Sequence, residues 1–262
     1  MHDPHPTAAP TPVERKARAM LLAAGRGERM RPLTDRLPKP LLEVRGKPLM
    51  QWPMEALAAG GFDSLVVNTA WLGDRIVERF GSEADLGAPG AANRVRIAYS
   101  HEGRDFGGAL ETAGGIVRAL PLLDEIFWVV AGDVFVPGFR FTQQAVERFA
   151  ASGRLAHLWL VPNPEHNPRG DFWLSEDGLA LNGSPGGESA SLTFSTIALY
   201  RAEFFAPPLC DIASGNPRGV AAPLAPMLRA AIEKAQVSAE RYLGSWTDVG
   251  TPARLAALDA DA

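Results

Sequence analysis

The chain has 262 residues, of which 46% are hydrophobic and 21% charged, a composition typical of folded globular proteins. The formal net charge of -4 argues against a nucleic acid polymer as the main partner, and no apolar run reaches the roughly 18 residues that a membrane-spanning helix needs. The single cysteine, Cys210, excludes an internal disulfide and a cysteine-based zinc site. We therefore expect a soluble, cytoplasmic protein that does not bind membranes.

Residues 1–18 are rich in Pro, Ala and Thr and lack the apolar core of about 7–15 residues that a secretory signal requires. We expect these residues to form a disordered extension, and the ordered chain to begin at residue 19.

Apolar runs and segments with helical spacing then alternate along the chain. The predicted strands are 19–24, 64–68, 94–100, 126–131, 156–161 and 192–200. The predicted helices are 49–59, 73–80, 110–120, 142–151 and 223–236. This alternation predicts an α/β fold, with a mostly parallel sheet and helices on both faces. A glycine-rich stretch at 170–191 contains short strand-like pieces such as 171–175, which favours one domain with an elaborated second half over two domains.

A glycine loop follows the first predicted strand directly. Gly25 and Gly27 allow backbone N–H groups to approach a phosphate closely, and Arg29 offers a planar donor fork for phosphate oxygens. The spacing matches neither a Walker loop nor GxGxxG. An ordinary strand-to-helix turn with exposed arginines is therefore an equally good interpretation of these residues alone.

Lys39 lies shortly after this loop, between Pro38 and Pro40. Only four of the 26 Lys and Arg residues are lysine, so a lysine at this place indicates a need for a compact ammonium group. Chance is the competing explanation, because Lys47 lies nearby without an evident role.

Four motifs in order resemble those of the sugar-1-phosphate nucleotidyltransferases. They are LAAGRGERMRPLT at 22–34 with PKP at 38–40, LETAGG at 110–115, VAGD at 130–133 and WTDVGTP at 246–252. The resemblance covers residues 19–258. It implies a Rossmann-like, GT-A-like α/β domain with a mixed, mostly parallel sheet, a nucleotide-binding half at about 19–135 and a sugar-binding half at about 136–258.

Segments 66–72 and 163–172 resemble the branch of this family that acts on N-acetylmuramic acid α-1-phosphate. This implies that UTP and that sugar phosphate condense to UDP-N-acetylmuramic acid and pyrophosphate, in peptidoglycan sugar recycling. The alternatives are a mannose-1-phosphate guanylyltransferase or glucose-1-phosphate uridylyltransferase, and a non-catalytic nucleotide-sugar sensor. A sensor would be expected to lose the lysine or the acids, whereas Lys39, Asp133 and Asp248 are all present.

Asp133 and Asp248 are the expected metal ligands. Each follows an apolar or aromatic segment, which places a carboxylate at a strand end or loop mouth, where α/β sheets bind ligands. Taken singly, Asp133 could cap a turn and Asp248 could face solvent. The family resemblance implies that both hold Mg²⁺, an ion usually bound by one or two carboxylates together with substrate phosphates.

The resemblance assigns the nucleoside triphosphate to the first half of the chain. Gly25, Gly27 and Arg29 should hold the triphosphate, and Lys39 should stabilise the charge that develops as pyrophosphate departs. Arg29 and Lys39 are therefore the expected catalytic residues. Ala23 should lie with Gly25 against the base and ribose.

Two further residues are assigned to the nucleotide. Gly114 follows the turn that contacts the base. Asn68 either orients the base or sugar or satisfies only the neighbouring backbone.

The acceptor sugar is assigned to the second half. Gly170 and Asp171 should open its pocket, and Asn182 either contacts the sugar or forms a tight turn with Gly183. The absence of a hexapeptide repeat removes the usual trimerisation element of bifunctional relatives, so we expect a monomer or small homo-oligomer.

The chain departs from the family pattern at two places. Residues 182–184 read Asn-Gly-Ser where many relatives carry Glu-Lys-Pro, so a second phosphate clamp must come from an arginine such as Arg169 or Arg218, or from Lys47. Thr196 occupies a position that is usually glycine, and a β-branched residue takes positive φ only with strain. This substitution puts the geometry of the acceptor pocket in question.

Two aromatic residues are expected to have structural roles. His166 is expected to be an ordinary loop histidine, and Trp246 to orient the Asp248 loop by packing.

Overall fold

The computed structural model describes residues 18–87, 93–186 and 190–260. The expected disordered extension lies outside these residues except for Arg18, whose N–H donates to Asp124 Oδ2 at 3.1 Å. Within the described ranges, no helix combines the length and the apolar character needed to cross a membrane.

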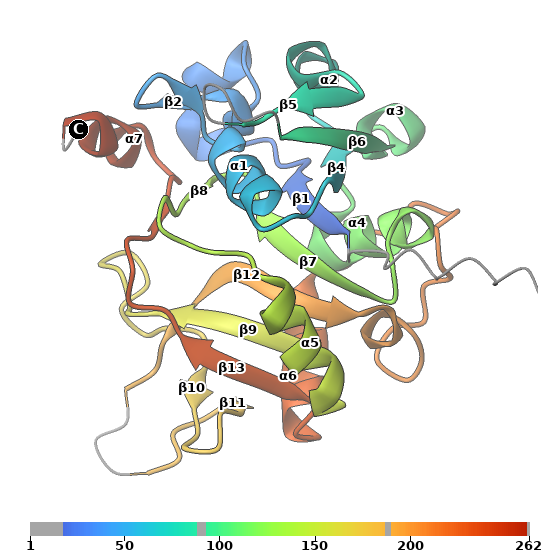
Figure 1. The fold of residues 1–262 in the computed structure, drawn as a ribbon, viewed down its shortest axis with the longest axis vertical. Coiled ribbons are helices and arrows are strands. Elements are labelled where there is room, and N and C mark those ends of the chain that lie inside the picture. Colours follow the sequence, from blue (N-terminus) through green and yellow to red (C-terminus); the bar gives the residue numbers. More distant parts are fainter. Residues whose placement is uncertain (1–17, 88–92, 187–189, 261–262) are drawn as a thin grey trace, which may run out of the picture.

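A sheet of eight strands runs through the molecule in the order β13-β9-β12-β7-β1-β4-β6-β5 (Figure 1). The strands are β1 (Ala19–Ala23), β4 (Ser64–Thr69), β5 (Glu83–Asp85), β6 (Arg94–His101), β7 (Ile126–Ala131), β9 (Ala156–Val161), β12 (Thr193–Arg201) and β13 (Val237–Arg241). Only β5 and β12 run against the other strands of this sheet, so the predicted mixed, mostly parallel sheet is confirmed. The pairing of β7 with β12 carries the sheet from the first half of the chain into the second.

The described helices are α1 (Gln51–Ala59), α2 (Gly73–Phe80), α3 (Glu102–Phe106), α4 (Glu111–Ala119), α5 (Gln143–Ser152), α6 (Leu224–Glu233) and α7 (Pro252–Ala260). Short two-stranded pairs join β2 (Glu43–Val44) to β3 (Lys47–Pro48), β8 (Val134–Phe135) to β14 (Thr247–Asp248), and β10 (Trp173–Leu174) to β11 (Ala180–Leu181). Five 3-10 helices complete the assigned elements: η1 (Glu28–Met30), η2 (Leu33–Asp35), η3 (Lys39–Leu41), η4 (Leu120–Leu122) and η5 (Ala202–Phe205).

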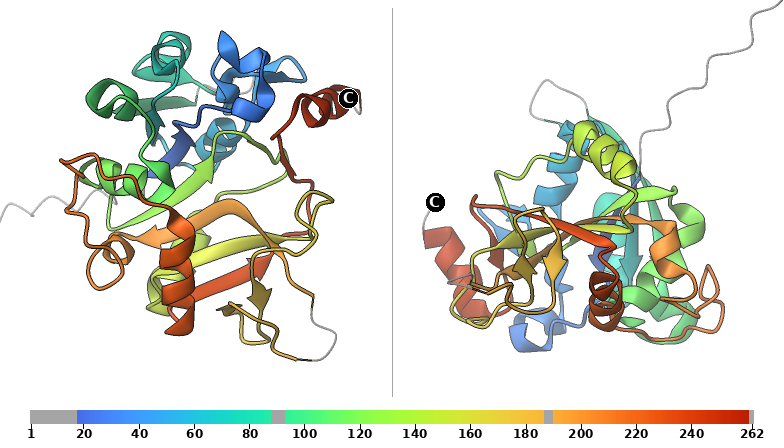
Figure 2. Two further views of the ribbon diagram at one scale, coloured as in Figure 1. Left: turned by 180° about the vertical axis from the view of Figure 1, so that it is seen from behind. Right: turned by 90° about the horizontal axis from the view of Figure 1, so that it is seen from below.

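Helices cover both faces of the sheet, as predicted (Figure 2). Successive strand residues point to opposite faces, so β1 contributes Leu21 to one hydrophobic cluster and Met20 to the other. The Leu21 cluster contains residues of α1, α2 and α5, and the Met20 cluster contains residues of α4 and α6. Because β1 is covered on both faces, nearly all of it had to be apolar, which is why the sequence predicted it well.

Trp128 of β7 is fully buried at the centre of an aromatic group. Its ring centroid lies 4.8 Å from that of Trp159, 5.0 Å from Phe141, and 6.2 Å from both Phe62 and Phe139. These rings come from both halves of the chain. They therefore fix the strand whose carboxyl end leads to Asp133.

The predicted strands and helices are present, with ends that differ by a few residues. The helix predicted for 223–236 ends at Glu233, and the strand-like piece at 171–175 contains only the two residues of β10. Both edge strands of the sheet, β5 and β13, and the helices α3 and α7 are not among the predicted elements.

The end of α1 packs closely on the loop before α5, and a substitution of Gly60, directly after this helix, tests that packing. A Cβ atom on Gly60 would lie 2.0 Å from the backbone oxygen of Phe141. Because backbone cannot rotate away as a side chain can, we expect Gly60→Ala to lower the free energy of unfolding by about 1–3 kcal/mol in urea denaturation. Gly183→Ala is the matched control, since a Cβ there meets no atom within 4 Å. Equal losses of stability in the two variants would contradict this packing.

Candidate active site

The glycine loop leaves the carboxyl end of β1 and turns at Gly27. Gly27 has φ 65°, in the left-handed region, and a Cβ on it would lie 3.0 Å from Lys39 Cβ. Gly25 is exposed, and a Cβ on it would meet nothing within 4 Å. Gly27 is thus needed for the turn and for close contact with Lys39. At Gly25, in contrast, the backbone is exposed and no neighbouring atom excludes a side chain.

Arg26 fastens this loop to the rest of the molecule. Its guanidinium lies 3.8 Å from the Trp71 ring centroid, donates to Thr34 O at 2.8 Å and pairs with Asp35 at 3.0 Å. The hydrogen bond from Arg26 is the main reason why the pKa of Asp35 lies below its ordinary value. Arg29, in contrast, is exposed and lines a pocket beside the loop.

Lys39, Asp133 and Asp248 meet at one point. The Lys39 ammonium lies 2.5 Å from Asp133 Oδ2 and 3.9 Å from Asp248 Oδ1. The Lys39 side chain is 9% exposed, whereas the two carboxylates are 32% and 26% exposed. The structure therefore brings the two predicted metal ligands to the same buried ammonium.

Backbone pairing explains why these two distant carboxylates converge. Asp133 precedes β8, and β14 pairs antiparallel with β8 so that Asp248 lies opposite Val134. The N–H of Val249 also donates to Asp133 O at 3.1 Å. The last segment of the chain thus returns across the carboxyl end of β7.

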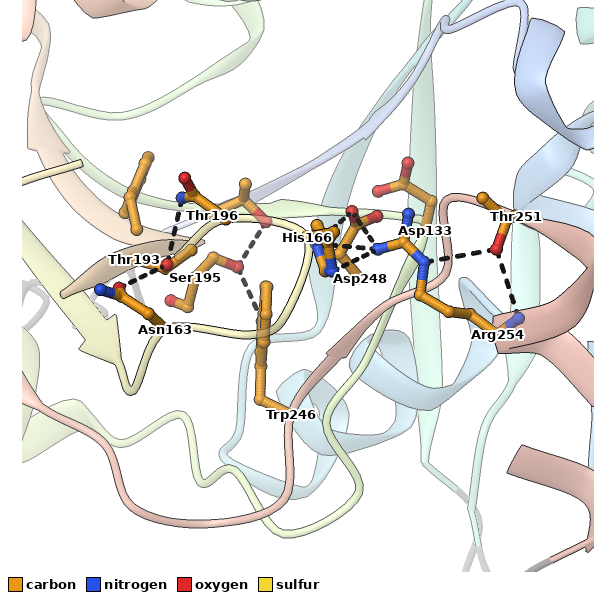
Figure 3. Close-up of polar contacts among 12 residues, drawn as sticks. Asp133, Asn163, His166, Thr193, Ser195, Thr196, Trp246, Asp248, Thr251 and Arg254 are labelled. Carbon is orange, nitrogen blue, oxygen red and sulfur yellow. Dashed lines mark hydrogen bonds and ion pairs between the residues drawn. The ribbon is translucent and has the colours of Figure 1, made fainter. Parts of the chain in front are cut away.

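Asp248 has two more partners, which Figure 3 shows beside it. Arg254, at the start of α7, donates from Nη1 to Asp248 Oδ2 at 3.0 Å. His166 Nε2 lies 3.4 Å from Asp248 Oδ2 and 2.8 Å from Arg254 Nη1. His166 lies in a turn, as expected of a loop histidine, but it also contacts a site carboxylate, which the sequence did not indicate.

In the described part of the chain, no three His, Cys, Asp or Glu residues are grouped so that they could hold a metal ion. Protein side chains alone would therefore not complete a metal site around Asp133 and Asp248. Two carboxylates nevertheless suit Mg²⁺, which commonly takes its other ligands from water and substrate phosphates.

Two adjoining pockets open at this point. The smaller, of about 350 Å³, is lined by the glycine loop with Arg29, Lys39 and Asp133. The larger, of about 720 Å³, is lined by residues of the first half of the chain, such as Asn68 and Thr112, and of the second half, such as Phe172 and Arg229. Leu22, Gly25 and Asp133 line both pockets, so Asp133 lies where their contents would meet.

Asn68 belongs to a buried polar network. Its Oδ1 accepts from the N–H of Ala23 at 2.7 Å, and its Nδ2 donates to Glu102 Oε1 at 2.7 Å. Glu102 is fully buried, and its Oε2 accepts from the N–H of Leu110 at 2.7 Å. Burial raises the pKa of Glu102 above its ordinary value, although these two hydrogen bonds act in the opposite direction. The network ties the end of β1 to the start of α4.

Gly114 lies in the first part of α4, behind the pocket wall. A Cβ on Gly114 would lie 2.5 Å from Val220 O, and its own oxygen accepts from Asn216 Nδ2 at 3.1 Å. Its neighbours Glu111 and Thr112 line the larger pocket, whereas Gly114 is not among the lining residues. Gly114 thus allows the close packing that sets the position of this wall.

The predicted acceptor residues divide into lining and supporting positions. Asp171 lines the larger pocket, and its Oδ2 accepts from the N–H of Phe194 at 2.8 Å. Gly170 has φ 60°, and a Cβ on it would lie 2.7 Å from Asn163 Oδ1. Asn182 is not among the lining residues, and its Nδ2 donates to Arg229 O at 2.9 Å.

Thr196 adopts the strained conformation that its position demands. It has φ 64°, its Oγ1 donates to Ser195 O at 2.5 Å, and the pairing of β12 with β9 shifts register between Phe194 and Ala198. A non-glycine residue with left-handed backbone lowers the stability of the fold by about 1–3 kcal/mol, and it persists where the surrounding structure enforces that conformation. The β-branched residue therefore keeps left-handed backbone in the wall of the larger pocket.

Of the cations considered for a second phosphate clamp, none lines either pocket. Lys47 pairs with Glu55 at 2.5 Å and lies over the Trp52 ring, while Arg169 and Arg218 are absent from both linings. Arg229 lines the larger pocket instead.

Arg229, Arg254 and Glu102 were not predicted as site residues. Arg229 and Arg254 lie in helices, where an arginine usually faces solvent, and Glu102 comes two residues after the strand predicted for 94–100. A weak signal was available for Arg254, which comes shortly after the motif that contains Asp248.

The raised pKa of Glu102 predicts a specific pH dependence of stability. The contribution of a group whose pKa is raised by folding is complete below its ordinary pKa, about 4.3 for Glu, and is lost as pH rises through the higher folded value. Since glutamine does not titrate, the free energy of unfolding of the unmodified chain should fall relative to that of Glu102→Gln as pH rises from about 4 to about 7. Urea denaturation across this range measures the difference, and Glu78→Gln on the exposed face of α2 serves as the control. A difference that stays constant, or changes in the other direction, would rule out this environment for Glu102.

The comparisons with known proteins agree with the motifs and the fold. Residues 18–170 match the nucleotidyl transferase family. The chain is 46% identical over 244 residues to N-acetylmuramate alpha-1-phosphate uridylyltransferase of Neisseria meningitidis, covering 91% of this chain and 95% of that protein. It is 34% identical to the protein of the same name from Caulobacter vibrioides, covering 91% and 94%.

Among solved structures, a putative glucose-1-phosphate thymidylyltransferase from Bacillus anthracis superposes with a TM-score of 0.71, over 93% of this chain and 94% of that one. At 19% identity this likeness shows the fold. The matched region and the two relatives show that the chain is an enzyme of the nucleotidyl transferase family.

Proposed function

We propose that this enzyme condenses UTP with N-acetylmuramic acid α-1-phosphate to give UDP-N-acetylmuramic acid and pyrophosphate. The observation that carries the proposal is the meeting of Lys39, Asp133 and Asp248, because Asp133 lines both pockets and Lys39 lines the smaller one. The choice of substrates is supported by two relatives whose names specify that reaction, at 46% and 34% identity over nearly their whole length. The same proposal assigns the reaction to the cytoplasm and to the recycling of peptidoglycan sugars.

The two pockets suit the two anionic parts of this reaction. The smaller one, with Arg29 and the backbone of the glycine loop, would hold the β- and γ-phosphates. The Asn68 and Thr112 side of the larger pocket would hold the nucleoside, and the Asp171 and Phe172 side would hold the sugar. A volume of about 720 Å³ lies within the range of small-molecule sites.

Asp133 and Asp248 would hold Mg²⁺, which their donor chemistry and their convergence favour. When bound, this ion would neutralise phosphate charge and reduce the repulsion between the two substrates.

The chain's own residues would then act by position and charge. A sugar phosphate oxygen forms the new bond to the α-phosphorus of UTP, the bond from that phosphorus to the bridging oxygen breaks, and pyrophosphate leaves with the electron pair. The Lys39 ammonium, which lines the smaller pocket, would donate to the phosphate oxygens as this charge develops. Because no covalent intermediate with the enzyme is needed, no nucleophilic side chain is required.

The substrate assignment is tested by a panel of UTP, GTP and dTTP, each combined with the 1-phosphates of N-acetylmuramic acid, N-acetylglucosamine, glucose and mannose. We expect the highest kcat/KM, measured by pyrophosphate release, for UTP with N-acetylmuramic acid α-1-phosphate. A higher value for GTP with mannose 1-phosphate, or for UTP with glucose 1-phosphate, would replace our proposal by that activity. Nucleotide-sugar binding in calorimetry without any pyrophosphate release would indicate a sensor.

The role of Lys39 is tested by comparing two lysines that have equally close carboxylate partners. Lys39→Gln should lower kcat/KM by about 100- to 1,000-fold, because it removes a preorganised charge from the site. Lys47→Gln should retain activity within about twofold, since Lys47 pairs with Glu55 at 2.5 Å outside both pockets.

Metal binding by Asp133 and Asp248 is tested by a separate variant and by removal of Mg²⁺. Asp133→Asn should lose most turnover, and EDTA should abolish activity until Mg²⁺ is restored. Circular dichroism of each variant would check that it is folded. Full activity in EDTA, or an unaffected Asp133→Asn enzyme, would remove the metal assignment.

A further inference from the structure

Arg229 presents a cation to the acceptor side of the larger pocket. Leu224, Ala225, Leu228 and Arg229 of α6 all line this pocket, so one face of the helix is turned toward it. The Arg229 guanidinium lies 5.3 Å from the ring centroid of Phe172, which also lines the pocket. A guanidinium against an aromatic ring has a preferred orientation while its N–H donors remain available.

Four of the five other charged residues in this lining already have partners, Asp171 among them, and the exception is Glu111, which has none among the described residues. Arg26 is paired with Asp35, Glu102 accepts hydrogen bonds from Asn68 and Leu110, and Asp133 is paired with Lys39. Of the two arginines in this lining, Arg229 is the one for which the described chain supplies no carboxylate within ion-pair distance. Its planar donor fork is therefore free to bind an anion.

The backbone at Arg229 is also held in place. Asn182 Nδ2 donates to Arg229 O at 2.9 Å, which ties the segment after β11 to α6. Asn182 therefore supports the pocket wall through Arg229, without itself lining the pocket.

The reaction requires the 1-phosphate of the acceptor to lie near Asp133 and Lys39. Whatever reaches Arg229 must then be a different part of the sugar. Glucose, mannose and N-acetylglucosamine 1-phosphates have no second anionic group. N-acetylmuramic acid 1-phosphate has one, the carboxylate of its 3-O-lactyl ether.

We propose that Arg229 binds the lactyl carboxylate of the acceptor and thereby selects N-acetylmuramic acid 1-phosphate over N-acetylglucosamine 1-phosphate. This inference rests on the proposed function and adds the residue responsible for its specificity. Arginine suits the task because its donors match the two oxygens of a carboxylate.

Steady-state kinetics with UTP and each of the two acceptors test the assignment. Arg229→Gln should raise KM for N-acetylmuramic acid 1-phosphate about 10- to 100-fold, the usual effect of losing a hydrogen-bonded charge pair, and leave KM for N-acetylglucosamine 1-phosphate within about twofold. Arg229→Lys should give an intermediate KM, because it restores the charge without the planar fork. Arg75→Gln is the matched control, since Arg75 is an exposed arginine on α2 outside both pockets.

The possible failures can be told apart. If the unmodified enzyme does not prefer the carboxylated acceptor, the proposed function is wrong. If it has that preference and Arg229→Gln retains it, only the Arg229 assignment is wrong. An equal rise in KM for both acceptors would also overturn the assignment, because it would indicate a role in holding the fold or the shared 1-phosphate.

Discussion

The ion pair between Lys39 and Asp133 joins segments on which the whole site depends. An ammonium group that is nearly buried needs a close carboxylate, because an unpaired charge loses its hydration without compensation. The pair connects the chain after the glycine loop to the end of β7, and Asp248 brings the C-terminal segment to the same ammonium. The backbone pairing of β14 with β8 brings Asp248 beside Asp133, and Lys39 then contacts both carboxylates.

The charges of the site are organised around these carboxylates. Asp133 contacts Lys39, while Asp248 contacts Lys39, Arg254 and His166. Cations fixed by such contacts need little rearrangement when anionic substrates bind, which is the usual source of electrostatic catalysis. The chain as a whole has a net charge of -4, so any attraction of anions would have to come from these local cations and not from the protein's overall charge.

Most of the central sheet could be predicted because β1, β4, β7 and β9 are covered on both faces and are therefore almost continuously apolar. The edge strand β13, with the sequence Val-Ser-Ala-Glu-Arg, buries only alternate residues, and two-residue strands have no periodicity to detect. The site divides in the same way. Lys39, Asp133 and Asp248 lie in short motifs, whereas the positions of Glu102, His166 and Arg229 beside the site result from tertiary contacts that no local pattern encodes. The conflict at Thr196 between a β-branched residue and a position that is usually glycine could be foreseen, but not that the chain keeps a φ of 64° there.

The contacts of Ser195 and Trp246 connect the acceptor pocket to the carboxylate pair (Figure 3). Trp246 Nε1 donates to Ser195 O at 3.0 Å, and the same oxygen accepts from Thr196 Oγ1. Trp246 precedes Asp248 by two residues, so its indole orients the Asp248 loop by a hydrogen bond as well as by packing. The left-handed turn at Thr196 presents Ser195 O to this indole and also forms part of the pocket wall. A change of backbone at Thr196 would therefore move both the wall of the larger pocket and the partner of the Trp246 indole, two residues before Asp248. A strained residue persists where its surroundings enforce its conformation, and the hydrogen bond from Trp246 to Ser195 O supplies such a restraint here.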